Sequence, residues 1–467
     1  MNPLALLVAG CFFMEFLDGT IITPALPQMA ATLGTNPVEL HVGISAYLLT
    51  VAVFILPGGW AAERYGARTV FTAAIAVFTA ASALCALATS PATFVAARIL
   101  QGVGGAMMVP VGRLVVLRTT EKSNLMRAIA LLTWPALTAP LIGPPLGGFI
   151  AEHLDWRYIF IVNLPLGLIA GLLALRLTPP FAAPTRRRFD WRGFLLAGAA
   201  CLCAELALDL LGADHPRYLL AATLAAAAAA ATLLVTRHLS RTPNPLIDPT
   251  PWRVSTFNAV MLAGTAMRGL IAAMPFLLPL MFQLGFGYDA FHAGALILAL
   301  FAGNIGIKPA TSFFLRRFGF RTVIGANAAI QAAAMLGCAT VGPETPLTLF
   351  LPLLALAGAS RSMQFTALAT LAFADIPQDR MSPANTWFSV AFQLGNGIGV
   401  AVGALLLRLA ATLLHTQPTL AAFHLAFAAL AILMLALATT ALSLHPDAGQ
   451  TVSGHTLKPA RPQSAQR

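Results

Sequence analysis

The chain has 467 residues, of which 58% are hydrophobic and 10% are charged, and its formal net charge is +11. Ordinary soluble domains are about 45–50% apolar and about 25% charged, so this composition excludes a soluble globular protein and indicates a membrane protein. The basic excess could suggest a nucleic-acid partner, but most of the basic residues lie in short connections between apolar segments.

Fourteen apolar segments are long enough to cross a membrane as helices. A hydrocarbon core about 30 Å thick needs roughly 20 apolar residues per helical span. We therefore predict an all-α polytopic membrane protein with fourteen transmembrane helices. In chain order the predicted spans are 4–26, 40–60, 70–89, 93–116, 128–151, 157–176, 191–211, 217–236, 254–282, 290–314, 321–341, 346–372, 384–410 and 420–444.

A short basic string occurs twice in the chain, 253 residues apart. Residues 63–70 are ERYGARTV, and residues 316–323 are RRFGFRTV. The same offset places Asn36 over Asp289, and each of these residues precedes an apolar span. A membrane chain with such a repeat is typically a transporter in which two homologous bundles move around a midplane site.

The repeat predicts how the chain is divided. Residues 1–176 form an N-terminal six-helix bundle and residues 254–444 a C-terminal one. Residues 177–253 hold two proline-rich cytoplasmic linkers and an inserted hairpin of helices seven and eight. Residues 445–467 are polar and are expected to form a disordered cytoplasmic tail.

The basic residues predict the orientation of the spans. When the spans alternate from a cytoplasmic N-terminus, nearly all the basic loops fall on the cytoplasmic side, and only Arg157 and Arg217 fall on the other. This is the positive-inside pattern of a multi-pass inner-membrane protein with both termini in the cytoplasm. The net charge therefore reflects topology, and no nucleic-acid partner is expected.

Several functional classes have no support in the sequence. All five cysteines lie within spans, and neither a disulfide nor a metal site is implied. The chain has no HExxH, GxSxG or GxxxxGK[ST] motif. We expect no enzyme activity, no cofactor and no ATPase subunit, so transport would be driven by an ion gradient.

The first span carries two carboxylates, Glu15 and Asp18. They are three residues apart and share one helix face. Two carboxylates in a low-dielectric site repel each other, so one is expected to hold a proton near neutral pH, as proton-coupled transport requires. A purely structural alternative is that Asp18 bonds to Arg98 or caps the segment Pro24–Pro27.

Four basic residues within spans are candidates for the substrate cavity. Arg268 and Arg361 are near the middle of their spans, whereas Lys308 and Arg113 are nearer the cytoplasmic ends, where a long side chain can reach the headgroups. The second bundle's spans contain no acidic residue, so these charges favour an anionic substrate or a gating role. Arg408 is close to the outer interface and is expected to be structural.

The fifth span has an unusual composition. Residues 134–148 include four prolines and three glycines. We expect a kinked helix with a smooth face for close packing, which could bend as the bundle moves.

These features together resemble the major facilitator superfamily, in particular its fourteen-span drug:proton antiporters. The Gln101–Leu114 segment is similar to a branch of multidrug resistance proteins within that family. The resemblance covers the first six spans densely and is carried by Leu17–Pro27, Gly59–Arg68, Arg98–Ala106, Ile142–Ile150, Asp155–Phe160 and Asn163–Gly167.

The resemblance implies roles for particular residues. Asp18 and Arg98 match positions linked with proton coupling, to which we add Glu15, which is not typical of the family. At the loop motif, Glu63 replaces the family's aspartate and Ala67 replaces a basic residue. The implied gating loop is Gly59, Glu63, Arg64, Gly66 and Arg68 with Arg317, Gly319 and Arg321 of the repeat, and the antiporter motif is Gly143, Pro144, Gly147 and Gly148.

The sequence therefore predicts a major facilitator fold and a proton-coupled efflux transporter for small organic, drug-like molecules. Its partners would be the substrate, protons and the lipid bilayer. One alternative is an exporter of organic anions such as citrate or metal-citrate. An alternative of another class is a polytopic sensor or membrane enzyme that transports nothing.

Overall fold

The computed structural model describes residues 3–35, 37–180, 188–212, 216–415 and 419–455, so Asn36 of the repeat lies outside the described residues. Within these ranges every regular element is a helix and there is no strand, which confirms the predicted all-α class. Ten helices are long and apolar enough to cross a membrane, and a bent pair, His292–Gly306 with Lys308–Cys338, gives an eleventh.

The helices follow the predicted spans in order. The N-terminal half contains α1 (Pro3–Ile21), α2 (Leu26–Leu33), α3 (Pro37–Tyr65), α4 (Ala67–Ala86), α5 (Pro91–Thr119), α6 (Leu125–His153), α7 (Tyr158–Ile161) and α8 (Asn163–Leu177). The inserted hairpin is α9 (Trp191–Gly212) and α10 (Tyr218–Arg241). The C-terminal half contains α11 (Ser255–Ala259), α12 (Thr265–Leu280), α13 (Ala290–Gly306), α14 (Lys308–Cys338), α15 (Leu347–Ala374), α16 (Met381–Leu413), α17 (Leu420–Ala438) and α18 (Gln450–Ser453).

The two copies of the repeated loop share a backbone conformation that favours glycine. Gly66 precedes α4 with φ +86°, and Gly319 interrupts α14 with φ +74°. Both values lie in the left-handed region, where a side chain is strained. The break lies between the two parts of α14, which are the end of the tenth predicted span and most of the eleventh.

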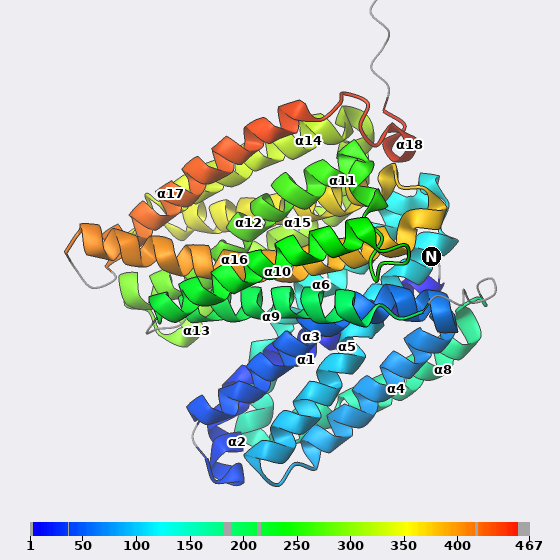
Figure 1. Ribbon diagram of the computed structural model, residues 1–467. Helices are drawn as coiled ribbons and strands as arrows, with labels where there is room; N and C mark the ends of the chain where they lie inside the picture. Colours follow the sequence, from blue (N-terminus) through cyan, green and yellow to red (C-terminus); the bar gives the residue numbers. More distant parts are fainter. Residues whose placement is uncertain (1–2, 36, 181–187, 213–215, 416–418, 456–467) are drawn as a thin grey trace, which may run out of the picture.

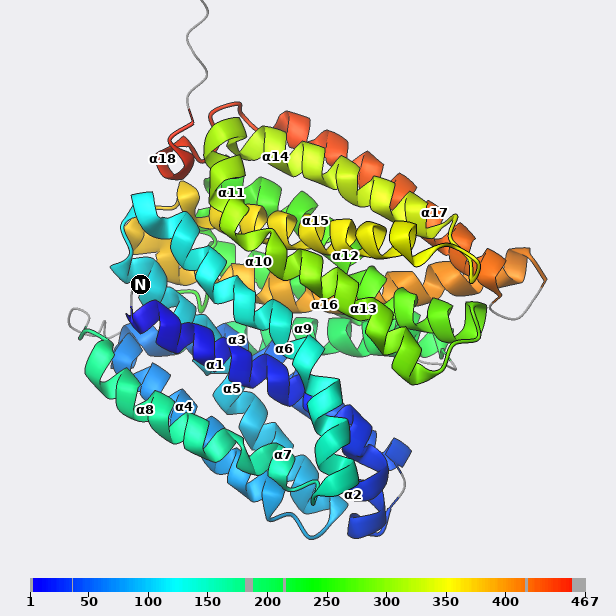
Figure 2. The same cartoon turned by 180° about the vertical axis from the view of Figure 1, so that it is seen from behind.

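The two bundles meet at one end and diverge toward the other (Figures 1 and 2). The end where they meet holds the start of α1, the repeated loops and α18. We call it the basic end, because it carries the connections rich in Arg and Lys at 64–68, 118–127, 188–192, 237–253 and 316–321.

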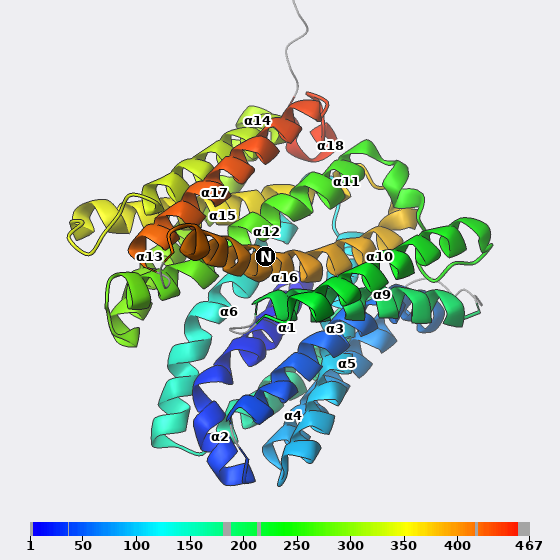
Figure 3. The same cartoon turned by 60° about the vertical axis from the view of Figure 1, so that its left-hand side comes forward.

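The inserted hairpin covers one of the two seams between the bundles. Helix α9 packs against both α3 and α16, one helix from each bundle, and α10 packs on α9 from outside (Figure 3). On the other seam α6 packs against α13, α14 and α15, and none of the long helices that the structure describes covers it (Figure 2). The hairpin therefore makes the two sides of the molecule unequal.

Hydrogen bonds stabilise both ends of the hairpin, within the insertion itself at the basic end and to α16 at the other end. At the basic end, the Asp190 carboxylate accepts hydrogen bonds from the Gly193 amide (2.8 Å), His238 Nε2 (2.9 Å) and the Leu246 amide (3.1 Å). At the other end, Arg408 Nη1 donates to the Leu211 carbonyl at 2.6 Å. Arg408 is thus structural, as expected, because it joins α16 to the C-terminus of α9.

The expected disorder from residue 445 onward is wrong as far as residue 455. Ala448 and Val452 are buried, α18 packs against helices of both bundles, and Thr451 Oγ1 donates to the Ala374 carbonyl at 3.2 Å. Burial of these apolar side chains in a mostly polar segment orders it. Residues 456–467 lie outside the described residues.

Asp190→Ala is expected to lower the thermal unfolding midpoint of the purified protein. It removes the N-cap of α9, typically worth about 1 kcal/mol, and the bonds to His238 and Leu246. Scanning fluorimetry in detergent measures the midpoint. Asp379→Ala, which removes an exposed carboxylate at the same end, is the control, and equal midpoints for the two variants would contradict the role of Asp190.

The same comparison has a defined pH dependence. Burial alone would raise the pKa of Asp190, but the bonds from Gly193, His238 and Leu246 outweigh it and hold the pKa below its ordinary value. A carboxyl whose pKa is lower in the folded than in the unfolded protein stabilises the fold at pH values above its unfolded pKa. That stabilisation is lost as the pH falls through its folded pKa. The midpoint difference between wild type and Asp190→Ala should therefore shrink only below about pH 4.

Candidate functional site

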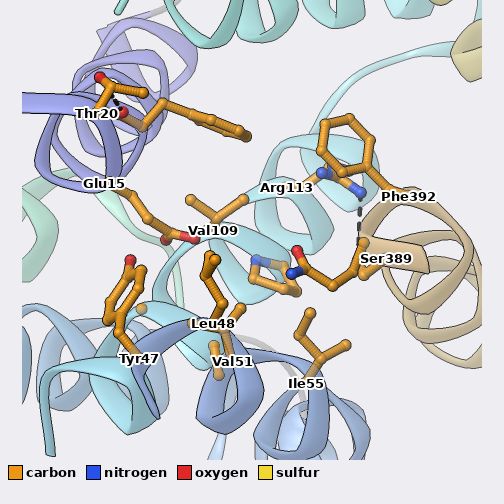
Figure 4. A pocket seen from close by; sticks show the side chains of 16 residues that line it. Glu15, Thr20, Tyr47, Leu48, Val51, Ile55, Val109, Arg113, Ser389 and Phe392 are labelled. Atoms are coloured by element: carbon orange, nitrogen blue, oxygen red, sulfur yellow. Dashed lines mark hydrogen bonds between the residues drawn. The ribbon is translucent and has the colours of Figure 1, made fainter. Parts of the chain in front are cut away.

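A central cavity of about 180 Å³ lies between the bundles and is lined by α1, α3, α5 and α16 (Figure 4). Its wall is mostly apolar and includes Leu48, Val51 and Val109. Glu15 and Tyr47 lie on one side of it, and Arg113 lies on the side of α16. Among the residues lining this cavity, Glu15 is the only acidic one and Arg113 the only basic one.

Glu15 faces the cavity without a fixed partner. Its Oε2 is buried and has no hydrogen-bond partner among the described residues, and neither has the Tyr47 hydroxyl beside it. A Cβ at Gly105 would lie 3.5 Å from Glu15 Oε2 and 3.2 Å from the Tyr47 hydroxyl, so the glycine lets both groups approach α5. An intramembrane carboxylate with no partner is costly, and such groups usually bind an ion, a proton or a ligand.

Asp18 occupies a different environment from Glu15. It forms an ion pair with Arg98, with 2.6 Å between Oδ2 and Nη1, and both side chains are fully buried. The other carboxylate oxygen, Oδ1, accepts hydrogen bonds from Gln101 Nε2 and Asn163 Nδ2, both at 2.9 Å. Every acceptor of Asp18 is thus engaged, and the side chain does not line the cavity.

The Arg98 side chain extends this network. Its Nη1 also donates to Gln101 Oε1 at 2.6 Å, and the guanidinium carbon lies 4.2 Å from the centre of the Tyr47 ring. Gln101 Nε2 in turn donates to Ser82 Oγ at 2.9 Å. The network therefore joins α1, α3, α4, α5 and α8, and Tyr47 places one of its members against the cavity.

Arg113 points into the protein and not toward the headgroups, contrary to the expectation from its place in the span. It is buried, and its Nη1 donates to Ser389 Oγ of the opposite bundle at 3.3 Å. The guanidinium lies 5.1 Å from the Phe388 ring and 5.4 Å from the Phe12 ring. Arg113 thus connects the two bundles at the wall of the cavity.

Arg268 and Arg361 lie within the C-terminal bundle behind an aromatic layer. The Arg268 guanidinium carbon is 3.5 Å from the centre of the Phe392 ring and 4.2 Å from that of Phe365, and Arg361 is 5.5 Å from Phe365. No carboxylate in the described ranges forms an ion pair with either arginine. Cation–π contacts offset part of the cost of burying these charges.

Three of the four predicted cavity residues, Arg113, Arg268 and Arg361, lie around the rings of Phe365 and Phe392, but not all of them line the central cavity. Arg113 lines the central cavity, whereas Arg268 and Arg361 do not, because Phe392 lies between Arg268 and the cavity wall. Lys308 is farther toward the basic end. Its Nζ donates to Thr133 Oγ1 of α6 and to Thr366 Oγ1 of α15, both at 2.8 Å, so it also joins the two bundles.

The predicted gating loop lies where the bundles meet. A Cβ at Gly59 would come within 2.6 Å of Thr386 Oγ1 and 3.2 Å of Ser382 Oγ, so the glycine allows α3 to approach α16 closely. Nearby, Asn385 Nδ2 donates to the Pro110 carbonyl at 2.8 Å, again across the bundles. These contacts close the basic end.

The charged members of the loop act within their own halves. Arg68 Nη2 donates to the Leu175 carbonyl, and Glu63 interacts electrostatically with Arg118. In the repeat, Arg317 is exposed. The described residues show no bond for Arg64 or Arg321.

The antiporter motif forms a close helix contact. A Cβ at Gly147 would lie 1.9 Å from the Ile21 carbonyl oxygen, and one at Gly143 would lie 2.2 Å from Thr20 Oγ1. The smooth face of α6 thus packs directly on α1, the helix that carries Glu15. Gly148 is nearest to Pro24, at 3.9 Å, and Pro144 is exposed.

Sequence reasoning missed four residues of the site: Tyr47, Gln101, Asn163 and Phe392. Gln101 is three residues after Arg98 and so shares its helix face, which was a usable signal. Asn163 is a polar residue at the start of an apolar helix, which was a second signal. Tyr47 and Phe392 look like ordinary apolar positions, and only the packing shows their role.

Comparisons with known proteins identify a family model and relatives that match most of the chain. Residues 8–400 match a family model described as Major Facilitator Superfamily. A relative that carries the name multidrug resistance protein MdtD, from Klebsiella pneumoniae (strain 342), is 38% identical over 411 residues, which cover 86% of this chain and 85% of that protein. Another of that name, from Salmonella paratyphi A (strain ATCC 9150 / SARB42), is 38% identical over 404 residues with the same coverage.

Two solved structures share the fold. The human organic anion transporter MFSD10 has a TM-score of 0.66 at 16% identity, covering 94% of this chain and 99% of that one. The proton:xylose symporter XylE has a TM-score of 0.65 at 14% identity, covering 97% and 98%. At these identities the likeness concerns the fold alone, and it confirms the predicted two-bundle architecture.

The Asp18–Arg98 pair is expected to be structural. Asp18→Asn or Arg98→Gln alone leaves one buried charge without its partner, which typically costs about 3–5 kcal/mol. The double variant removes both charges and is expected to lose less stability than either single change. Unfolding midpoints of the three variants in detergent test this.

Glu15→Gln is the matched control, because Glu15 Oε2 has no hydrogen bond to lose. Its midpoint should stay close to that of the wild type. A double variant at least as unstable as the two single changes added together would show that the charges are not coupled.

Proposed function

This chain belongs to the major facilitator superfamily, and we propose that it is a proton-coupled antiporter that exports small, drug-like organic molecules across the inner membrane. The basic end faces the cytoplasm in this proposal, with both termini on that side, as the positive-inside rule favours. The observation that carries the proposal is the lone carboxylate of Glu15 on the mostly apolar wall of the central cavity.

The chemistry of the cavity suits lipophilic cations. Aromatic and aliphatic side chains offer contact area, and one carboxylate offers a charge partner, which together resemble the usual composition of small-molecule sites. Phe16 also lines the cavity, and an aromatic ring can attract a cation. The names of the relatives, which refer to multidrug resistance, support drug-like substrates.

Glu15 provides a simple basis for exchange. When ionised it can hold a cationic substrate, and when protonated it no longer attracts one. Binding of a proton from the outer side would therefore favour release of the substrate there. After the bundles rock, loss of the proton to the cytoplasm restores the ionised carboxylate.

The Asp18–Arg98 pair has a positioning role in this scheme. It stays paired, and through the Arg98 guanidinium it fixes the Tyr47 ring beside Glu15. Of the predicted proton-coupling residues, Glu15 thus carries the proton, and Asp18 and Arg98 position the side chains around it.

The gating residues fit alternating access. With the basic end toward the cytoplasm, the structure is closed inward and diverges outward (Figure 1). The inward opening requires the contacts of Gly59 with Ser382 and Thr386 to separate, along with the Asn385–Pro110 bond. The Gly143–Gly147 face would carry α1, and with it Glu15, along with α6.

A second candidate substrate class is organic anions such as citrate. The observation that favours it is the set of Arg113, Arg268 and Arg361, for which the described residues of the C-terminal bundle supply no carboxylate. For an anion to reach Arg268, Phe392 would have to move aside.

Glu15→Gln is expected to abolish uphill transport. In proteoliposomes with an imposed pH gradient, the wild type should move ethidium faster than protein-free vesicles, and the variant should not, because its amide cannot release a proton. Glu344→Gln, the same change on an exposed loop residue, should behave like the wild type. Continued gradient-driven movement in Glu15→Gln would contradict the assignment of the proton to Glu15.

Counterflow of citrate separates the two substrate classes. We expect wild-type proteoliposomes preloaded with unlabelled compound to accumulate labelled ethidium and not labelled citrate. Arg268→Gln should then leave ethidium exchange largely intact. Citrate exchange in the wild type that disappears in Arg268→Gln would instead assign the protein to organic-anion export.

A further inference from the structure

A second cavity, distinct from the central one, lies at the basic end on the seam that the hairpin leaves uncovered. It has a volume of about 800 Å³ and is formed by the connection between α5 and α6, the first turns of α6, and the junction of α13 and α14. Its lining includes Thr120, Arg127, Trp134, Ile305 and Lys308. The proposed transport cycle uses none of this space.

The wall of this cavity has a polar and an apolar part. Thr120, Asn124 and Arg127 lie at the basic end, whereas Leu131 and Trp134 follow along α6 toward the membrane interior. Seven residues separate Arg127 from Trp134, which corresponds to about 10 Å along a helix. Trp134 is 44% exposed, so the apolar part is accessible from the lipid side. An amphiphile with its head at the basic end matches this division.

The polar part carries more positive than negative charge. Lys308 has two hydroxyl partners and, within the part of the chain that the structure describes, no carboxylate. Thr120 Oγ1 is buried without a hydrogen-bond partner there. Arg127 is exposed at the rim, and the single carboxylate in the lining, Glu121, does not balance the two basic residues. The cavity is therefore complementary to an anionic headgroup.

We propose that this cavity binds an anionic phospholipid, with its phosphate near Lys308, Arg127 and Thr120 and an acyl chain along Leu131, Trp134 and Ile305. Basic pockets between transmembrane helices commonly bind such headgroups. A tryptophan at the depth of the upper acyl chain is also typical of lipid contacts. The assignment does not depend on which substrate the central cavity carries.

The bound lipid has a consequence for the closed basic end. Lys308 joins α6 to α15 through Thr133 and Thr366, so it bridges the bundles only while this end is closed. A phosphate beside Lys308 contacts residues of both bundles in this closed state. It loses its partners on one bundle when the bundles part. The lipid therefore shifts the population toward the state described here.

The test uses the full-length protein in detergent and compares phosphatidylglycerol with phosphatidylcholine. Phosphatidylglycerol should raise the unfolding midpoint more, and Lys308→Gln or Arg127→Gln should each weaken its binding about five-fold. Arg237→Gln removes an exposed charge at the same end but beside the covered seam. This variant should bind phosphatidylglycerol as the wild type does. Arg127 is exposed, so its variant is expected to fold even if Lys308→Gln does not.

Two further measurements make the result decisive. Phosphatidylglycerol with brominated acyl chains should quench tryptophan fluorescence, and the quenching should fall in Trp134→Phe, which places the chain in the cavity. Equal binding by the wild type and the Lys308→Gln/Arg127→Gln double variant would overturn the proposal. Inorganic phosphate or glycerol phosphate that raises the midpoint as much as the lipid would also overturn it, in favour of a site for free anions.

Discussion

The buried ion pair of Asp18 and Arg98 determines the arrangement of the N-terminal bundle around the central cavity. Two charges in a low-dielectric interior are costly unless they are paired and supported by further hydrogen bonds. Gln101 of α5 and Asn163 of α8 donate to Asp18, Ser82 of α4 accepts a bond from Gln101, and the Tyr47 ring covers the Arg98 guanidinium. Because this network holds Asp18 inside the bundle, Glu15 is the only carboxylate on the cavity wall.

The distribution of charge between the two halves follows from this arrangement. The N-terminal bundle pairs Arg98 with a carboxylate, whereas the C-terminal bundle covers Arg268 and Arg361 with the rings of Phe365 and Phe392. An aromatic ring stabilises a cation less than a carboxylate does, so these charges remain available to a ligand or to a neighbouring helix in another state. Phe392 belongs both to this layer and to the cavity wall, which links the interior of one bundle to the shared site.

Much of the fold was predictable from the sequence, because a span is a property of about 20 consecutive residues and the repeat relates two such sets. The agreement at Gly66 and Gly319 shows that the repeated string encodes a backbone conformation as well as a charge. The site was less predictable. The sequence offers Asp18 as a partner of Arg98, which the structure confirms, but it does not show that Glu15 on the same helix face is left without a partner. The places of Arg113 and Lys308 depend on how the helices are rotated in the bundle, and the order of residues 445–455 depends on a groove that forms only after folding.

The hairpin has a mechanical consequence for any motion between the bundles. Its helix α9 is packed on α3 and α16, and Arg408 of α16 bonds to its C-terminus, so it is a fixed contact between the two bundles along one side of the molecule. Packed helices slide only slightly against one another, and larger displacements need a hinge. The bundles should therefore rotate relative to each other about an axis near α9. The displacement would be small beside α9 and largest along α6 and α13.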